Sequence, residues 1–177
     1  MTAQTIAAAL QRVEAVLRRR PEIGLHDDAP AIARWEGGTR IVASHANGTR
    51  MSTDMPSELG GSGDQVTPGW LFRAGLASCF STCVAMSAAA EGIDLTELEV
   101  RAGSRSDTRG LLGMTDAGGE PVCAGPRDVH LLVRISARGV SAQRLRTLVD
   151  DSLRCSPVPE AVQSAVPIAL TVEIGCG

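Results

Sequence analysis

Two cysteines one helical turn apart, Cys79 and Cys83, are the residues of this sequence best suited to chemistry. They lie in the stretch TPGWLFRAGLASCFSTC, in which Thr67 and Pro68 predict a helix start and apolar and small residues follow. Residues four apart share one face of a helix, with Cβ atoms about 5–6 Å apart. A disulfide requires about 3.5–4.5 Å between these atoms. A direct bridge between Cys79 and Cys83 therefore requires a distorted helix.

A reactive Cys79 needs a stabilised thiolate, because a free cysteine with a pKa of about 8.5 is ionised to only a few per cent at pH 7. The helix dipole acts mainly on the first turn, and Cys79 lies about three turns into the predicted helix. A neighbouring cation is therefore required. Arginine suits this role, because its charge is permanent and it donates several hydrogen bonds. In the structural alternative, the cysteines are small apolar residues packed where helices approach closely.

The sequence predicts neither a metal site nor a cofactor. Two thiols without other convergent ligands make a poor zinc site, because zinc usually takes four ligands. The three histidines lie in unrelated segments, at His26, His45 and His130. The glycine-rich residues 56–66 lack the GK[ST] ending of a phosphate-binding loop, so we expect a flexible loop there.

Composition indicates one domain that associates with neither nucleic acid nor membranes. The chain has 177 residues, of which 44% are hydrophobic, so it can bury a substantial core. Its net charge is −3 and aromatic residues make up 2%, which disfavours nucleic acid and anionic membranes as partners. Five cysteines without a CxxC do not resemble a disulfide framework, and the amphipathic start lacks an apolar signal region. We expect a cytoplasmic protein.

The segment from Trp70 to Ala90 is apolar enough to raise the question of a membrane span. It also contains Arg73, several serines and Thr82, and no other segment resembles it. A helix buried inside the protein or at a dimer interface is therefore the better interpretation.

Hydrophobic periodicity and turn residues predict an α+β protein with one dominant central helix. An N-terminal helix and linker occupy residues 1–30, and the main domain occupies residues 31–177. Gly37-Gly38 and Asn47-Gly48 are the turns expected between the first strands. The elements expected after the linker are strands near 31–36, 40–45 and 49–54, a helix over 68–91, a strand over 98–106, an irregular segment over 107–126, a strand over 129–137, helices over 141–154 and 156–162, and a closing strand over 168–174.

Four motifs in this order resemble the OsmC/Ohr family. The run TPGWLFRAGLASCF resembles the family's central helix, and MPSELGGSG resembles the glycine-rich loop that precedes it. Downstream, GIDLTELEV and RCSPVPEAV resemble later landmarks of the family. The similarity covers roughly residues 31–174, with the N-terminal helix as an extension.

This resemblance implies a sheet wrapped around a long central helix in an intertwined homodimer. It also implies a thiol-dependent peroxidase that reduces organic hydroperoxides and is restored by a dithiol reductant. By resemblance, Cys79 is the peroxidatic cysteine, and the arginine that steadies its thiolate falls near Arg40, with Arg34 as the alternative.

The sequence departs from the family pattern at two places. The glutamate expected directly after the helix-opening proline is Gly69, and Asp54 or Glu58 is a candidate substitute. The resolving cysteine expected directly before a proline is Ser156, which displaces Cys155 by one residue. The alternatives are that Cys155 resolves Cys79, that Cys83 does, or that neither does, whereas Cys123 and Cys176 are expected to be incidental.

These departures leave two hypotheses open. The first is an OsmC-like thiol peroxidase that uses Cys79, Cys155 and Arg40. The second is a non-enzymatic OsmC-like dimer that binds a small apolar or electrophilic ligand, or senses oxidants, in the same pocket.

Overall fold

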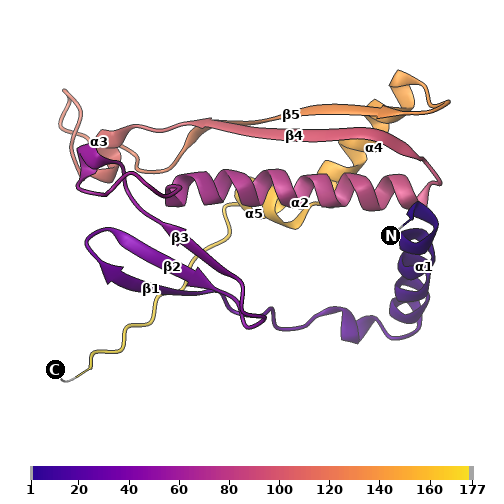
Figure 1. Ribbon diagram of the computed structural model, residues 1–177, viewed down its shortest axis with the longest axis horizontal. Helices are drawn as coiled ribbons and strands as arrows, with labels where there is room; N and C mark the ends of the chain where they lie inside the picture. Colours follow the sequence, from indigo (N-terminus) through magenta and orange to yellow (C-terminus); the bar gives the residue numbers. More distant parts are fainter. Residues whose placement is uncertain (1, 176–177) are drawn as a thin grey trace.

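The computed structural model describes residues 2–175, which form five α-helices and two small antiparallel sheets (Figure 1). The helices are α1 (Ala3–Arg19), α2 (Pro68–Ala90), α3 (Thr108–Leu111), α4 (Ala142–Arg154) and α5 (Pro157–Gln163). The strands are β1 (Ile32–Gly37), β2 (Arg40–Ser44), β3 (Arg50–Thr53), β4 (Leu95–Arg105) and β5 (Arg127–Ala137). Two short 3₁₀ helices, η1 (Pro21–Gly24) and η2 (Ser57–Leu59), lie in the connections.

Helix α2 begins and ends at the residues that the sequence predicts. The Thr67 hydroxyl accepts a hydrogen bond from the Trp70 N–H, and Pro68 occupies the first turn, where its missing N–H costs nothing. At the other end Gly92 takes a φ of +69°, which favours glycine. This turn lets the Ile93 N–H donate to the Ala88 carbonyl at 2.8 Å, and it leads the chain into β4.

The hydrophobic core lies between α2, the β4–β5 sheet and α4. The buried residues of α2 recur every four positions, at Leu76, Phe80, Val84 and Ala88, and therefore share one face. From Phe80 onward this face packs with Ile93, Leu145 and Leu148, and apolar residues of β4 and β5 cover the cluster. One face of α2 is thus fully used within the chain.

The β1–β3 sheet is set apart from this core. In Figure 1 it lies on the opposite side of α2 from β4 and β5, below the end of α2 at which the helix begins. The Asn47-Gly48 turn joins β2 to β3 as predicted, with Ser44 paired to Arg50. Apolar side chains of this sheet remain exposed, including Ile32, Trp35 and Met51. The sheet therefore has an uncovered apolar surface within one chain.

The predicted helices and strands are confirmed except for the closing strand over 168–174, and α3 is a helix that the sequence did not predict, in the segment 107–126 expected to be irregular. Residues 164–175 pair with none of the strands that the structure describes, and they run as a tail past the β1–β3 sheet (Figure 1). The tail alternates apolar with other residues, as a strand does, but each of Ile168, Leu170, Val172 and Ile174 is at least 70% exposed. A strand needs a neighbouring edge for its hydrogen bonds, and this chain gives the tail none. For the single chain, the prediction of a closing strand is wrong.

Candidate active site

Cys79 and Cys83 lie on α2 beside its buried stripe. Both are half-buried, and each directly precedes a fully buried residue, Phe80 and Val84 respectively. The two cysteines therefore face the margin of the core rather than its interior. All four cysteines among residues 2–175 are free thiols, and Cys176 lies outside the described residues.

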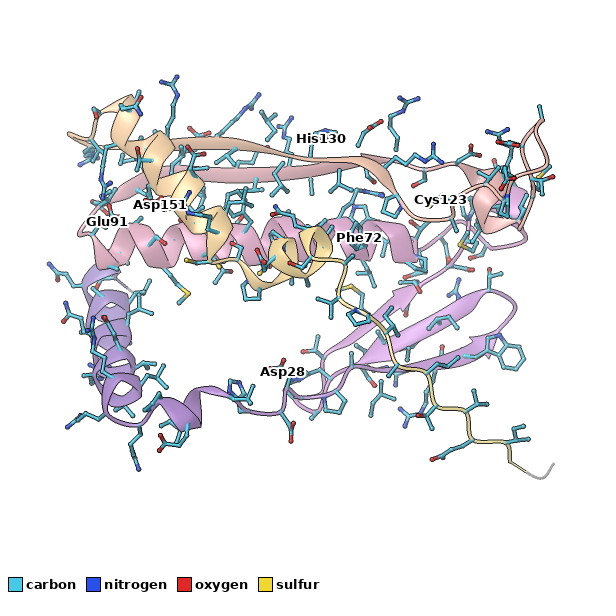
Figure 2. All side chains as sticks on the ribbon, turned by 180° about the vertical axis from the view of Figure 1, so that it is seen from behind. Asp28, Phe72, Glu91, Cys123, His130 and Asp151 are labelled. Atoms are coloured by element: carbon cyan, nitrogen blue, oxygen red, sulfur yellow. The ribbon has the colours of Figure 1, made fainter. Side chains whose placement is uncertain are left out.

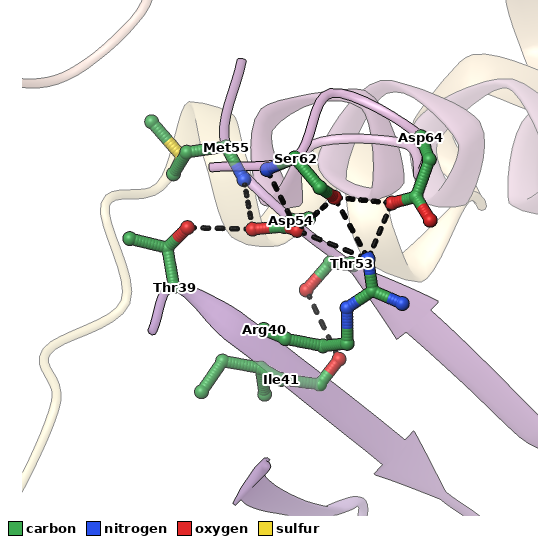
Figure 3. Close-up of polar contacts among 8 residues, drawn as sticks. All are labelled: Thr39, Arg40, Ile41, Thr53, Asp54, Met55, Ser62 and Asp64. Carbon is green, nitrogen blue, oxygen red and sulfur yellow. Dashed lines mark hydrogen bonds and ion pairs between the residues drawn. The ribbon is translucent and has the colours of Figure 1, made fainter. Parts of the chain in front are cut away.

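Arg40 is held by two carboxylates at the start of β2 (Figure 3). Its Nη2 donates to Asp54 at 3.2 Å, to the Ser62 hydroxyl at 2.8 Å, and to Asp64. Within the described residues, neither Nε nor Nη1 makes a hydrogen bond to a side chain. The Arg40 side chain is 33% exposed. Arg40 is thus a fixed cation with unused donors.

Asp54 is the buried anchor of this cluster, with a side chain only 4% exposed. It accepts hydrogen bonds from the Ser62 hydroxyl at 2.6 Å, from the Thr39 hydroxyl, and from the backbone N–H groups of Ser62 at 3.2 Å and Met55 at 2.8 Å. The hydrogen bonds from Ser62 and Thr39 hold the pKa of Asp54 well below its usual range. The carboxylate therefore stays charged, and its hydrogen bonds join β2, β3 and the glycine-rich loop.

The glycine-rich loop is folded onto Asp54. The expectation of a flexible loop over residues 56–66 is therefore wrong. The Gly60 N–H donates to Ser57 and the Gly61 N–H donates to Pro56. A Cβ atom at Gly61 would lie 1.8 Å from the Met55 carbonyl oxygen, so only glycine allows this close approach. The close turn brings Ser62 to the carboxylate.

Gly69 leaves an open position at the start of α2. The resemblance to the OsmC/Ohr family predicts a glutamate at this position. A Cβ atom there would meet nothing closer than Arg73 Nη1 at 3.8 Å and Thr67 Oγ1 at 3.9 Å. A Cβ atom would fit there at ordinary contact distances, so close packing does not impose glycine. A carboxylate at this position would lie beside Arg73, which itself reaches Ser104 at 3.5 Å.

A cavity of about 440 Å³ lies beside this open position. It is mostly apolar and is bounded by the loop before α2, the first turns of α2 and the segment around α3. Phe72 and Arg73 line it, and Figure 2 shows Phe72 on α2 with Cys123 near α3. Leu76 and Phe80, by contrast, belong to the buried face of α2 and do not line the cavity.

Cys155 lies against Cys83 rather than in a contact with Cys79. The Cys83 thiol donates to the Cys155 carbonyl oxygen at 3.8 Å. Cys155 is the exposed residue that ends α4, whereas Ser156 is completely buried and its hydroxyl donates to the Ser152 carbonyl at 2.8 Å. The one-residue displacement in the sequence therefore places serine inside the protein and cysteine outside it.

Comparison with known proteins identifies the family of the chain. A sequence model described as OsmC-like protein matches residues 61–171, which is more than half of the chain. The chain belongs to the OsmC-like protein family. No curated protein sequence matches it.

Solved structures share the fold. An OsmC-like protein from Mycoplasma pneumoniae superposes with a TM-score of 0.64 at 16% identity, covering 78% of this chain and 89% of the other. A putative osmotic stress induced and detoxification response protein from Psychrobacter arcticus gives 0.59 at 17% identity, covering 77% and 90%. An organic hydroperoxide resistance protein from Legionella pneumophila gives 0.56 at 21% identity, covering 78% and 92%. At these identities the likeness concerns the fold.

The apolar helix of this OsmC-like protein is its central core helix. Among the described helices, α2 alone is long and apolar enough to cross a membrane, and core helices of soluble proteins meet the same criteria. The OsmC-like fold accounts for it. Within residues 2–175, no three histidine, cysteine or acidic side chains form a potential metal site.

One chain of this OsmC-like protein assembles the Arg40 cluster but does not join it to Cys79. No hydrogen bond between Arg40 and Cys79 occurs among the described residues. Arg34, the alternative arginine, is exposed on β1. The sequence named Asp54 only as one of two candidates for the missing carboxylate, and it missed Thr39, Ser62 and Asp64. The sequence feature that points to Asp54 is its position at the end of a strand, directly before the glycine-rich loop.

The low pKa of Asp54 predicts a specific acid sensitivity. The unfolded carboxylate titrates near 3.8, so below that pH the unfolded chain binds a proton that the folded chain does not. The stabilisation by Asp54 is present above this pH and is lost as the pH falls further. We expect Asp54→Asn to lower stability at neutral pH and to flatten the acid decline, measured by urea unfolding from pH 7 to about pH 3. Exposed Glu58→Gln is the control, and an unchanged acid decline in Asp54→Asn would contradict the assignment.

Proposed function

We propose that this OsmC-like protein is a thiol-dependent peroxidase that reduces organic hydroperoxides through Cys79. The Cys79 thiolate attacks one peroxide oxygen, an S–O bond forms and the O–O bond breaks. The alkoxide leaves and takes up a proton to become an alcohol, while Cys79 becomes a sulfenic acid. A second thiol of the chain, Cys155 or Cys83, condenses with it and releases water. A dithiol reductant then restores both thiols by disulfide exchange.

The observation that carries the proposal is the free edge of Arg40. Asp54, Ser62 and Asp64 all bind Nη2, which fixes the guanidinium while leaving Nε and Nη1 without side-chain acceptors among the described residues. An arginine oriented in this way can donate to a thiolate or to a developing alkoxide. Because Asp54 supplies the orienting carboxylate, a glutamate at position 69 is not required.

The proposal includes an intertwined homodimer, because a second chain would provide a partner edge for the tail and a cover for the exposed apolar surfaces. The tail of residues 168–174 has the alternation of a strand without a partner edge, and the β1–β3 sheet has uncovered apolar residues. On α2, Trp70 and Met86 are 46% and 39% exposed. In the proposed dimer, these surfaces pair between chains, and the Arg40 cluster of one chain reaches the Cys79 region of the other.

We also propose where the protein is located and how its chain divides into domains. Free thiols that cycle through a disulfide suit the reducing cytoplasm and a dithiol reductant. Residues 31–177 form the OsmC-like domain, and residues 1–30 are an addition whose helix α1 stands against α2 near its end (Figure 1).

A second candidate function is binding of a small apolar or electrophilic ligand without turnover. It is favoured by the cavity of about 440 Å³ that Phe72 and Arg73 line and that Gly69 leaves open. In this function Cys79 would serve as a sensor of oxidants or as a packing residue.

A turnover assay separates the two functions. With cumene hydroperoxide and an excess of dihydrolipoamide, we expect the wild type to consume peroxide catalytically and Cys79→Ser to fall to the uncatalysed rate, because no other thiol begins the reaction. Cys123→Ser, in an exposed residue near α3, is the matched control and should retain the wild-type rate. Full activity of Cys79→Ser would contradict the proposal, and absence of turnover in the wild type would favour ligand binding.

The dimer is tested by sedimentation equilibrium. We expect the wild type to sediment at twice the chain mass of 18.4 kDa, and the double variant Ile168→Asp with Leu170→Asp to shift toward the monomer. The shift follows because buried, unpaired carboxylates would oppose burial of the tail. Leu112→Asp places one such charge at an exposed leucine outside the proposed interface and should leave the dimer intact. A monomeric wild type would overturn the proposed assembly.

A further inference from the structure

Cys83 contacts the backbone of a second cysteine, Cys155. Cys83 Sγ lies 3.8 Å from the carbonyl oxygen of Cys155, which places the two residues in direct contact across α2 and the end of α4. Cys83 is half-buried on a regular helix, whereas Cys155 is exposed and ends α4 outside helical geometry, with φ −105° and ψ 9°. The Cys155 side chain therefore lies outside the core.

The same geometry disfavours Cys155 as the direct partner of Cys79. Cys79 lies four residues before Cys83, about 6 Å away along the axis of α2. The residue that points into the protein at this junction is Ser156, whose hydroxyl is already bonded to the Ser152 carbonyl. Cys83 thus lies four residues from Cys79 and contacts the backbone of Cys155.

We propose that Cys83 is the resolving cysteine and that it passes the disulfide on to Cys155. The inference rests on the proposed peroxidase function for its first oxidation, and it adds a relay of three thiols to that function. Cys79 reacts with peroxide, Cys83 traps the oxidised sulfur, and Cys155 presents the disulfide to the external reductant.

The first step forms a bridge between Cys79 and Cys83. The Cys83 thiol attacks the sulfur of the Cys79 sulfenic acid, the S–O bond breaks, and hydroxide leaves with the thiol proton as water. A regular helix holds the two Cβ atoms too far apart for this bond. At this turn, side chains compete with the backbone N–H groups for the carbonyl oxygens of the helix. The Ser81 hydroxyl donates to the Ala77 carbonyl at 2.7 Å, and the Thr82 hydroxyl donates to the Ser78 carbonyl at 3.0 Å. Such side-chain bonds weaken and bend helices.

The second step relieves the bridge within α2. The Cys155 thiolate attacks Cys83 Sγ, the bond between Cys79 and Cys83 breaks, and Cys79 leaves as a thiolate ready for the next peroxide. No net oxidation or reduction occurs, because one disulfide replaces another. Strained disulfides exchange more readily than relaxed ones, so the reaction runs from the helical bridge toward Cys155. The exposed Cys155 sulfur is then accessible to a dithiol, whereas Cys79 and Cys83 are half-buried.

Disulfide mapping tests the relay in a Cys176→Ser background, since arginine-specific cleavage leaves Cys155 and Cys176 in one peptide. The reduced protein receives one equivalent of cumene hydroperoxide, is quenched with N-ethylmaleimide over time, and is digested and sequenced by mass spectrometry. In the parent we expect a bond between Cys83 and Cys155 to accumulate. In Cys155→Ser the bond between Cys79 and Cys83 should persist, and in Cys83→Ala Cys79 should remain a sulfenic acid that dimedone labels. Cys123→Ser should match the parent.

A second arm does not depend on peroxidase activity. Cys79→Ser is treated with diamide, which oxidises neighbouring thiols, and we expect a bond between Cys83 and Cys155. Absence of this bond overturns the relay whatever the peroxide does. A bond between Cys79 and Cys155 that forms in Cys83→Ala at the parent rate also overturns it. If diamide forms the bond but peroxide oxidises no thiol through Cys79, the proposed function fails and the exchange pair of Cys83 and Cys155 is supported.

Discussion

The architecture of the site depends on one buried negative charge, the carboxylate of Asp54. A buried carboxylate is costly unless hydrogen bonds and a cation compensate it. Here the compensation comes from three segments: Thr39 and Arg40 before and within β2, the backbone at Met55, and Ser62 in the glycine-rich loop. These hydrogen bonds hold the loop against the end of β3 and fix one nitrogen of Arg40. Asp54 is thus the carboxylate that holds Arg40, whereas position 69 lies beside Arg73.

A second constraint is the helix that the site is built on. One face of α2 is buried every fourth residue against β4, β5 and α4, which fixes the helix and the thiols beside that face. Apolar residues on β1–β3 and on the tail, by contrast, are exposed to solvent in the single chain. The proposed dimer links these two facts, since the surfaces that lack partners are those that lie near Arg40 and along α2.

Much of the fold could be predicted from the sequence, because local signals decide it. Thr67-Pro68 and Gly92 mark the ends of α2, and Asn47-Gly48 marks a hairpin, and all three act through backbone geometry. The closing strand at 168–174 failed because strand formation depends on a partner edge that periodicity does not reveal. The contacts of Asp54 and of Cys83 with Cys155 also escaped prediction, since they join segments far apart in the sequence. The resemblance gave Cys79 and Arg40, and the structure adds how Arg40 is held.

The central claim is that Arg40, held by Asp54, stabilises the thiolate of Cys79 in the assembled protein. It is tested most directly by the pH dependence of iodoacetamide alkylation, in a variant that keeps Cys79 as its sole cysteine, because only the thiolate reacts. We predict rapid alkylation at neutral pH that slows in Arg40→Met and is unchanged in Arg34→Met, which removes an exposed arginine of β1. Alkylation at the same rate in Arg40→Met and the parent would contradict the account.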